Sequence, residues 1–236
     1  MFKEMNIVNL LFPRRCPVCD KPVKTGEGLC CVKCRGRFRV IESPFCLKCG
    51  KPLSEEREEF CADCKKGRHL YRSGRALYEY ESAAEAIFRF KYGRRQEYAA
   101  FFGREMAEKL NNFILQVSPD GLLPVPLSRE RYLKRGYNQA ALLAKEIGSI
   151  LQIPVYDKII RRVRNTVPQK ELNPAERQNN LKRAFKIAQN DVKLSTIIIV
   201  DDIYTTGSTI NALTEVLFAA GVKQIYFIAL SAGSGM

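Results

Sequence analysis

Runs of apolar residues predict several strands of a buried sheet. Residues 197–200 are four consecutive branched apolar side chains, which is typical of a strand covered on both faces in a parallel sheet. Similar stretches at 122–126 and 221–230 predict two more strands, and alternation over 76–81 predicts another. The short stretch at 153–156 predicts one further strand.

Apolar residues at helical spacing occupy the segments between these strands. They predict a helix over 83–90, a break at 93–95 and one amphipathic stripe from Tyr98 to Ile114. Two more helices are indicated by the series Leu142, Leu143, Ile147 and Ile150, and by Ile210, Leu213, Val216 and Leu217. Strands that alternate with helices predict an α/β fold with a parallel sheet flanked by helices.

The junction after residues 197–200 combines the chemistry of a phosphate site and a sugar site. A helix start offers unpaired N–H groups and a partial positive charge, and Gly207 lets the backbone approach an anion. Asp201 and Asp202 can accept hydrogen bonds from sugar hydroxyls or lie near Mg²⁺. Hydroxyl donors are supplied by Thr205, Thr206, Ser208 and Thr209. The pattern predicts a ribose 5-phosphate site; the alternative is an acidic turn with a hydroxyl N-cap and no ligand.

A second anion site is predicted by the arginine-rich stretch at 128–139, which precedes a helix. Arg135 and Gly136, placed at the expected helix entrance, are its leading candidates, with Arg129 and Lys134 in support. A solvated charged turn is the alternative.

The most polar stretch of the chain spans residues 161–180, and a polar segment of this length in a compact domain is typical of a functional flap or of disorder. It supplies the candidates for a nucleic-acid contact, which are Arg161, Arg162, Arg164, Lys170 and Arg177. Lys91 and Arg94 lie near the end of an earlier helix, where plain surface charge is one interpretation. The alternative, implied by the resemblance to phosphoribosyltransferases given below, is that they belong to a hood and face the ligand of the sugar-phosphate site.

All nine cysteines precede Lys65, and eight of them form four Cys-x-x-Cys pairs. The arrangement repeats after 30 residues, and in this repeat Cys30 aligns with Phe60, which marks Cys30 as a packing residue. The eight expected metal ligands are Cys16, Cys19, Cys31, Cys34, Cys46, Cys49, Cys61 and Cys64.

Four thiolates around one ion form a closed site, so the pattern predicts structural zinc, two ions in all, and a double zinc ribbon. Disulfides, an iron–sulfur cluster and redox cysteines fit the spacing or the number of pairs less well. The sequence leaves open whether each repeat binds its own ion or the pairs interleave. His69, the single histidine, is interpreted as a linker residue.

The charge is strongly and unevenly basic. The formal net charge is +14, and residues 121–190 alone hold 14 basic and 5 acidic residues. Such an excess indicates an anionic partner, with nucleic acid as the leading candidate and a solvated basic surface as the alternative. No apolar run approaches 18 residues, so we expect no membrane span and a cytoplasmic protein.

The junction at 201–209 resembles the phosphoribosyl pyrophosphate motif of type I phosphoribosyltransferases. The resemblance implies that Asp201 and Asp202 hold the ribose hydroxyls, that residues 205–209 hold the 5-phosphate and that Mg²⁺ accompanies the ligand. It also implies a pyrophosphate loop around Arg135, a hood at about 69–118 and a flexible loop at about 161–183 that closes over the site.

Over nearly its whole length the chain is similar to the ComF family of competence-related, phosphoribosyltransferase-like proteins. The match lies in the N-terminal cysteine ribbon and in the segments 135–139, 164–169 and 201–209. It implies a double zinc ribbon at 1–68, a phosphoribosyltransferase domain at 69–236, single-stranded DNA as a partner, possible contacts with proteins of the DNA-uptake machinery and a role in natural transformation. Whether the domain is catalytic stays open, and the alternatives are a metabolic phosphoribosyltransferase acting on a nucleobase and a non-catalytic phosphoribosyl-pyrophosphate sensor.

Overall fold

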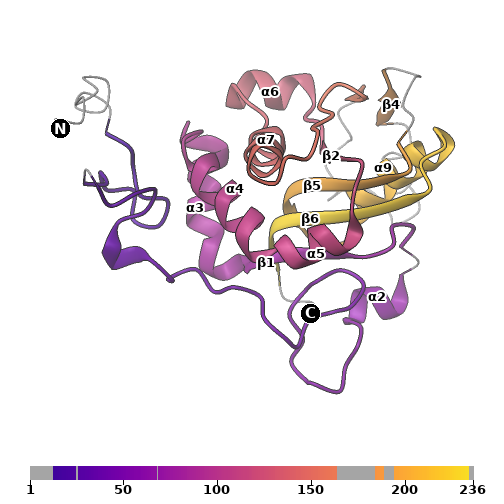
Figure 1. The fold of residues 1–236 in the computed structure, drawn as a ribbon, viewed down its shortest axis with the longest axis horizontal. Helices are drawn as coiled ribbons and strands as arrows, with labels where there is room; N and C mark the ends of the chain where they lie inside the picture. Colours follow the sequence, from indigo (N-terminus) through magenta and orange to yellow (C-terminus); the bar gives the residue numbers. More distant parts are fainter. Residues whose placement is uncertain (1–12, 25, 68, 164–183, 189–193, 234–236) are drawn as a thin grey trace.

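A parallel sheet of four strands lies at the centre of the molecule (Figure 1). The computed structural model describes residues 13–24, 26–67, 69–163, 184–188 and 194–233. The strand order is β1-β6-β5-β2, and each neighbouring pair is parallel. The strands are β1 (Gly74–Glu79), β2 (Gly121–Pro124), β5 (Thr196–Tyr204) and β6 (Gln224–Ala232). The predicted parallel sheet is thereby confirmed.

The strand β5 extends further than its apolar run predicts. Ile197, Ile198, Ile199 and Val200 are fully buried, as a strand between two neighbours requires. Pairing with β6 then continues through Asp201, opposite Ala229, to Tyr204. The strand therefore runs past the two carboxylates, on which the sequence indicated that it ends, and the ladder with β6 includes Asp201.

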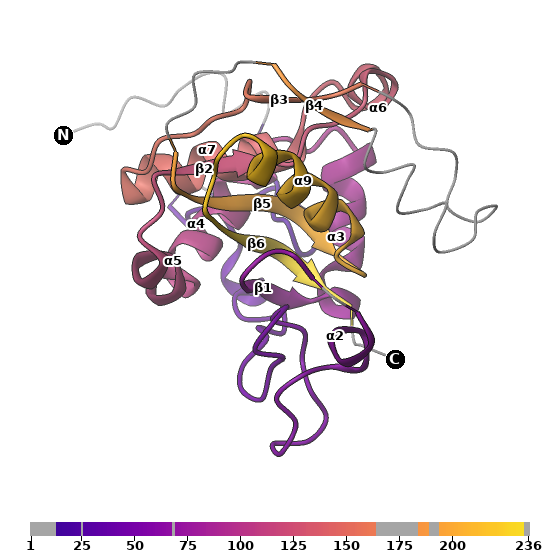
Figure 2. The same cartoon turned by 90° about the vertical axis from the view of Figure 1, so that its right-hand side faces the viewer.

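Helices cover both faces of the sheet, so the core has two layers, one on each side (Figure 2). One face is covered by α9 (Ser208–Ala219), and α3 (Tyr80–Tyr92), α4 (Tyr98–Lys109), α5 (Asn111–Val117) and α7 (Gln139–Leu151) pack in the other core cluster. The predicted stripe from Tyr98 to Ile114 is two helices, because the helical run breaks at Leu110. Of the helices in the described residues, none is long and apolar enough to cross a bilayer.

Two further expectations need correction. Residues 153–156 form no strand; Val155 makes a single bridge to Leu122. The arginine-rich stretch contains a short helix, α6 (Arg129–Arg135), and Gly136 ends it with a positive φ of 84°. Gly136 is the C-cap of α6, because glycine adopts this conformation without strain, and it also lies two residues before the N-cap of α7, at the predicted helix entrance. The next helix, α7, is capped by the Asn138 side chain.

A small antiparallel pair lies beside the sheet. It consists of β3 (Ile160–Arg162) and β4 (Phe185–Ile187), which flank the segment predicted to be a flexible loop. Residues 164–183 of that segment lie outside the described residues.

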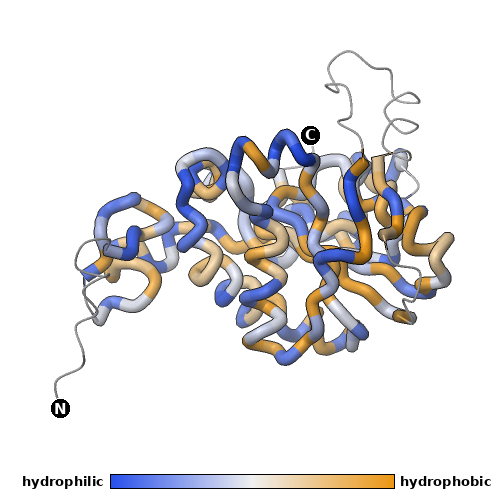
Figure 3. Tube along the Cα trace, turned by 90° about the horizontal axis from the view of Figure 1, so that it is seen from above, coloured by the Kyte–Doolittle hydropathy of each residue, from blue (hydrophilic) through white to orange (hydrophobic). Residues whose placement is uncertain are grey.

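The cysteine-rich part forms two separate units. The first, with the short 3-10 helix η1 (Val32–Cys34), lies at one end of the molecule beside α3 and α4 (Figures 1 and 3). It is anchored by Asp20, which accepts hydrogen bonds from Arg95 and Tyr98. The second unit, with α2 (Ala62–Lys66), packs against β1, and three of its cysteines belong to the same buried cluster as α9.

Candidate functional site

The turn from β5 to α9 forms a small hollow. Residues 203–210 and Asp201 line it, and its volume is about 30 Å³. Gly207 caps α9 with a positive φ of 76°, and the hydroxyls of Thr206 and Ser208 lie 2.8 Å apart at its rim. Backbone N–H groups at a helix start together with hydroxyl groups make this hollow suitable for a phosphate group.

The space behind Gly207 is filled, so no larger residue fits there. A Cβ atom at this position would lie 2.7 Å from the Tyr204 hydroxyl and 3.1 Å from the His69 ring. The Tyr204 hydroxyl is in turn 2.6 Å from that of Tyr71, and His69 stacks on Tyr71 with ring centroids 5.0 Å apart. The loop therefore rests on an aromatic support that the sequence did not reveal.

His69 has a more specific place than a linker residue. Its Nδ1 lies 3.3 Å from the Asn211 amide on α9, and the same amide group accepts a hydrogen bond from the Leu70 backbone N–H at 3.0 Å. These contacts tie the chain segment that enters β1 to the helix behind the phosphate hollow. No local pattern around a single histidine could have indicated such a long-range contact.

The carboxylate pair opens into a larger cavity of about 260 Å³. Asp202 forms an ion pair of 2.9 Å with Lys91 of α3, and both side chains are only 14% exposed. Asp201 accepts a hydrogen bond from the backbone N–H of Asp202 at 2.8 Å. The structure thus brings Lys91, a candidate from the sequence, directly to the acidic pair.

The two carboxylates are electrostatically unequal. Burial, followed by repulsion from Asp202, raises the pKa of Asp201 to about 7, although the Asp202 backbone N–H, Lys91 and Arg162 oppose the shift. Asp202 is balanced by the Lys91 ammonium group. A cation or a set of hydroxyl donors at Asp201 would therefore interact with a carboxyl group that is ready to ionise near neutral pH.

Arginine side chains surround the other side of the cavity. Arg131 and Arg135 come from α6, and Arg162 comes from β3. Burial and the nearby Arg131 lower the pKa of Arg162, whereas Asp201 raises it. Arg135 donates hydrogen bonds to Gln139 and to the Tyr92 hydroxyl. This wall suits a strongly anionic group.

The structure separates the predicted basic residues into distinct places. Arg135 lines the cavity, whereas Arg129 and Lys134 do not, and Arg94 is exposed with a φ of 54°. Sequence reasoning missed Arg131, although its position on α6 relative to Arg135 follows from helical spacing, because residues four apart share a face. The remaining candidates Arg164, Lys170 and Arg177 lie outside the described residues.

The eight predicted cysteine ligands gather in two groups of four. Within each group the ligand sulfur atoms all lie within 4.8 Å of one another. One group is Cys16, Cys19, Cys31 and Cys34, and the other is Cys46, Cys49, Cys61 and Cys64. Each 30-residue repeat therefore forms its own site, which answers the question that the spacing left open.

The distances and donor types fit tetrahedral zinc. Sulfur atoms about 2.3 Å from one ion lie about 3.8 Å from each other. The separations are 3.9 Å for Cys19 and Cys31, 3.7 Å for Cys31 and Cys16, and 3.6 Å for Cys49 and Cys61. Four thiolates would leave no open coordination position, so both sites fit a structural ion.

Cys30 lies beside the first group but outside the set of four. Its sulfur is 3.5 Å from that of Cys16, and the residue is 4% exposed. Burial, with the neighbouring Cys16, raises the pKa of the Cys30 thiol, so it stays protonated and can donate to the Cys16 sulfur. Cys30, which was predicted to be a packing residue, thus also makes a hydrogen bond to the expected metal ligand Cys16 from outside the set of four.

Comparison with known families agrees with this architecture. Residues 7–65 match the double zinc ribbon domain, and residues 133–234 match the phosphoribosyl transferase domain. The protein is thus a phosphoribosyltransferase-fold protein with a double zinc ribbon at its N-terminal side.

Similar proteins define the family more closely. Competence protein F of Haemophilus influenzae is 30% identical over 218 residues, covering 83% of this chain and 93% of that protein. Competence protein ComFC of Bacillus subtilis is 31% identical over 201 residues, covering 81% of this chain and 78% of its own length. The DNA utilization protein YhgH of Escherichia coli K12 is 28% identical over 221 residues, which cover 92% of this chain and 96% of that protein. The chain belongs to the ComF family of competence proteins.

The two cysteine groups share no ligand, so we predict that they bind metal independently. The purified protein should contain two zinc ions per chain, and Cys31→Ser should lose one of them because three thiolates hold zinc weakly. Cys30→Ser is the matched control and should keep both. Elemental analysis measures the content, and loss of both ions in Cys31→Ser would contradict two independent sites.

The raised pKa of Asp201 predicts that this carboxylate destabilises the folded chain above neutral pH. The folded state binds the proton more tightly than the unfolded state, so stability contributed by this group falls as pH rises from about 4 to about 7. Asp201→Asn mimics the protonated form. It should raise the free energy of unfolding at pH 8 by about 1–3 kcal/mol, since one pKa unit corresponds to about 1.4 kcal/mol and water that reaches the incompletely buried Asp201 reduces the effect.

Urea denaturation of both proteins at several pH values measures this difference. The gain should shrink as pH falls toward 4, because wild-type Asp201 is then protonated as well. A variant that is equally or less stable than wild type at pH 8 would show that the ionised Asp201 carboxylate does not destabilise the folded state.

Proposed function

We propose that this protein binds phosphoribosyl pyrophosphate with Mg²⁺ at the carboxyl end of β5. The observation that carries the proposal is that the phosphate hollow and the acidic cavity are contiguous, since Asp201, Thr205 and Thr209 line both. A ribose 5-phosphate carries its phosphate at one end and its hydroxyl groups on the ring. It therefore needs N–H and hydroxyl donors for the phosphate beside carboxylates for the ribose hydroxyls.

The arginine wall provides the third part of the ligand site. The pyrophosphate group would face Arg131 and Arg135, opposite the phosphate hollow, because guanidinium groups match phosphate oxygens in two hydrogen bonds. Mg²⁺ prefers oxygen ligands and would link the pyrophosphate to the ribose hydroxyls near Asp201. Lys91 keeps Asp202 in place and adds positive charge at the same edge.

We further propose that this ligand site serves DNA uptake, with single-stranded DNA as a partner. Two relatives are named competence proteins and a third a DNA utilization protein. The basic excess of residues 121–190 supports a polyanion partner. The double zinc ribbon favours this role over base salvage, which does not require such a module.

The double substitution Asp201→Ala with Asp202→Ala tests the ligand site. It should abolish binding of phosphoribosyl pyrophosphate in isothermal titration calorimetry with Mg²⁺ present, because the sugar hydroxyls lose both acceptors. The zinc content should stay at two per chain, since neither residue contacts the cysteine groups.

Glu56→Ala with Glu59→Ala removes the same charge from two exposed positions and is the matched control. It should bind the ligand as wild type does. Retained binding in the aspartate variant would place the sugar phosphate elsewhere.

Binding of single-stranded DNA should depend steeply on salt. Each neutralised phosphate lowers the slope of log K against log salt by about 0.7 for a single strand, so several contacts give a slope below about −2. Fluorescence anisotropy of a labelled oligonucleotide across a salt series measures it. Absence of binding at low salt, or affinity that does not change with salt, would refute the nucleic-acid role.

A further inference from the structure

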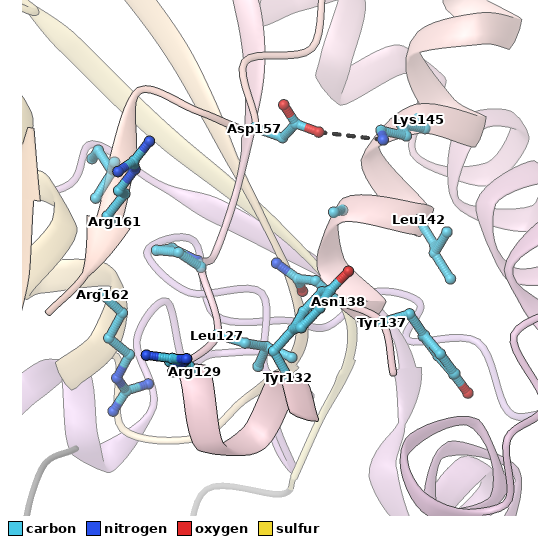
Figure 4. A pocket seen from close by; sticks show the side chains of 13 residues that line it. Leu127, Arg129, Tyr132, Tyr137, Asn138, Leu142, Lys145, Asp157, Arg161 and Arg162 are labelled. Atoms are coloured by element: carbon cyan, nitrogen blue, oxygen red, sulfur yellow. Dashed lines mark ion pairs between the residues drawn. The ribbon is translucent and has the colours of Figure 1, made fainter. Parts of the chain in front are cut away.

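A groove adjoins the cavity of the acidic pair, which is called the phosphoribosyl cavity below. It encloses about 530 Å³ and is lined by side chains from α6, α7 and β3, which converge in Figure 4. Leu127, Asn138 and Arg162 line both the groove and the cavity of the acidic pair. A ligand in this groove, which we call the α6–β3 groove, would therefore lie end to end with a ligand in the cavity.

One side of the α6–β3 groove is basic. Arg129 extends from α6, and Arg161 and Arg162 extend from β3, on the same side in Figure 4. Of the described residues that line the groove, Asp157 alone is acidic, and it pairs with Lys145 at 3.3 Å. The lining thus has a surplus of positive charge, which favours a ligand with phosphate groups.

The other side of the groove is aromatic and aliphatic. Tyr132 is 52% exposed on α6 and presents its ring in Figure 4, next to Leu127. Tyr137 is fixed by its hydroxyl, which donates to the Phe90 carbonyl at 2.6 Å, and Leu142 extends the apolar surface. Inorganic phosphate and pyrophosphate have no apolar face that could contact such a surface, whereas a nucleobase can stack on it.

The proximity of the two sides indicates the ligand class. Arginines for a backbone and an aromatic ring for a base are the two elements with which proteins hold single strands. A paired base could not reach the ring, because its face is covered by its neighbours in the duplex. The volume lies in the range of sites for small organic ligands, which includes a single nucleotide.

We propose that the α6–β3 groove holds one unpaired nucleotide of a DNA single strand, with its base on Tyr132 and its phosphates at Arg129 and Arg161. The proposal rests on the proposed nucleic-acid function and gives it a location. The strand would then pass the mouth of the phosphoribosyl cavity, with Arg162 between the two ligands.

The two kinds of contact predict two different changes in binding. For a fluorescein-labelled oligothymidylate, Tyr132→Ala should weaken binding by about five- to a hundredfold with an unchanged salt slope, because stacking releases no counterions. Tyr132→Phe should bind as wild type does. Arg129→Ala with Arg161→Ala should weaken binding and reduce the magnitude of the salt slope by about 1.4, or about 0.7 for each phosphate contact.

Two controls separate this proposal from the proposed function. Arg104→Ala with Lys223→Ala removes the same charge from exposed positions that line neither the groove nor the cavity, and it should leave both affinity and slope unchanged. Titration with phosphoribosyl pyrophosphate should give wild-type affinity for Tyr132→Ala, which also shows that the variant is folded. A duplex of the same length should be insensitive to Tyr132→Ala.

The outcomes are distinct. If wild type binds the oligonucleotide but the groove variants behave like the control pair, or Tyr132→Ala weakens duplex binding equally, the groove assignment is wrong while the proposed function stands. If wild type binds phosphoribosyl pyrophosphate but no oligonucleotide, the nucleic-acid function and the groove assignment both fail.

Discussion

The close packing behind Gly207 is the constraint on which the site depends. The Tyr204 hydroxyl and the His69 ring leave no room for a side chain, and the positive φ of Gly207 turns the chain from β5 into α9 around the hollow. Tyr204 stacks on Phe227 of β6 at 4.6 Å, and Tyr71 meets Phe227 edge-on. The phosphate loop is thus supported by the sheet itself instead of being a free surface turn.

The same support connects the second cysteine group to the ligand site. Lys51, which is 4% exposed, pairs with Asp63 at 2.7 Å and lies 5.8 Å from the centre of the Tyr204 ring. Gly50 approaches the backbone of β1 so closely that a Cβ atom there would lie 2.7 Å from the Arg75 Cα. A metal ion that folds this group would therefore also stabilise the wall behind the phosphate hollow. The first cysteine group, which packs on α3 and α4, has no such connection among the described residues.

The sequence was most informative where residues act locally. The apolar run at 197–200, the hydroxyl-rich turn after it and the Cys-x-x-Cys pairs each act within a few residues, so fold class and family could be predicted. Sequence reasoning failed where a short helix was overlooked and where tertiary contacts decide. Gly136 ends a helix because α6 forms upstream of it, and His69 acquires its place only when β1 and α9 come together.

The same limit applies to the basic residues. Charge patterning shows an excess of arginine around α6 but not which side chains point to the acidic pair, so Arg131 was missed while Arg129 was included. The sorting of these side chains into a cavity and a groove depends on the turn of one short helix and on its distance from β3. Helical spacing relates Arg131 to Arg135 once α6 is known, but the distance from β3 has no signature in the order of residues.

The central claim is that a phosphorylated ribose lies across the end of β5, and a crystal structure with phosphoribosyl pyrophosphate and Mg²⁺ tests it most directly. The account predicts electron density for the 5-phosphate in the hollow at residues 205–209, for the ribose hydroxyls at Asp201 and Asp202, and for pyrophosphate facing Arg131 and Arg135. Ligand density at another place, with this hollow empty, would contradict it.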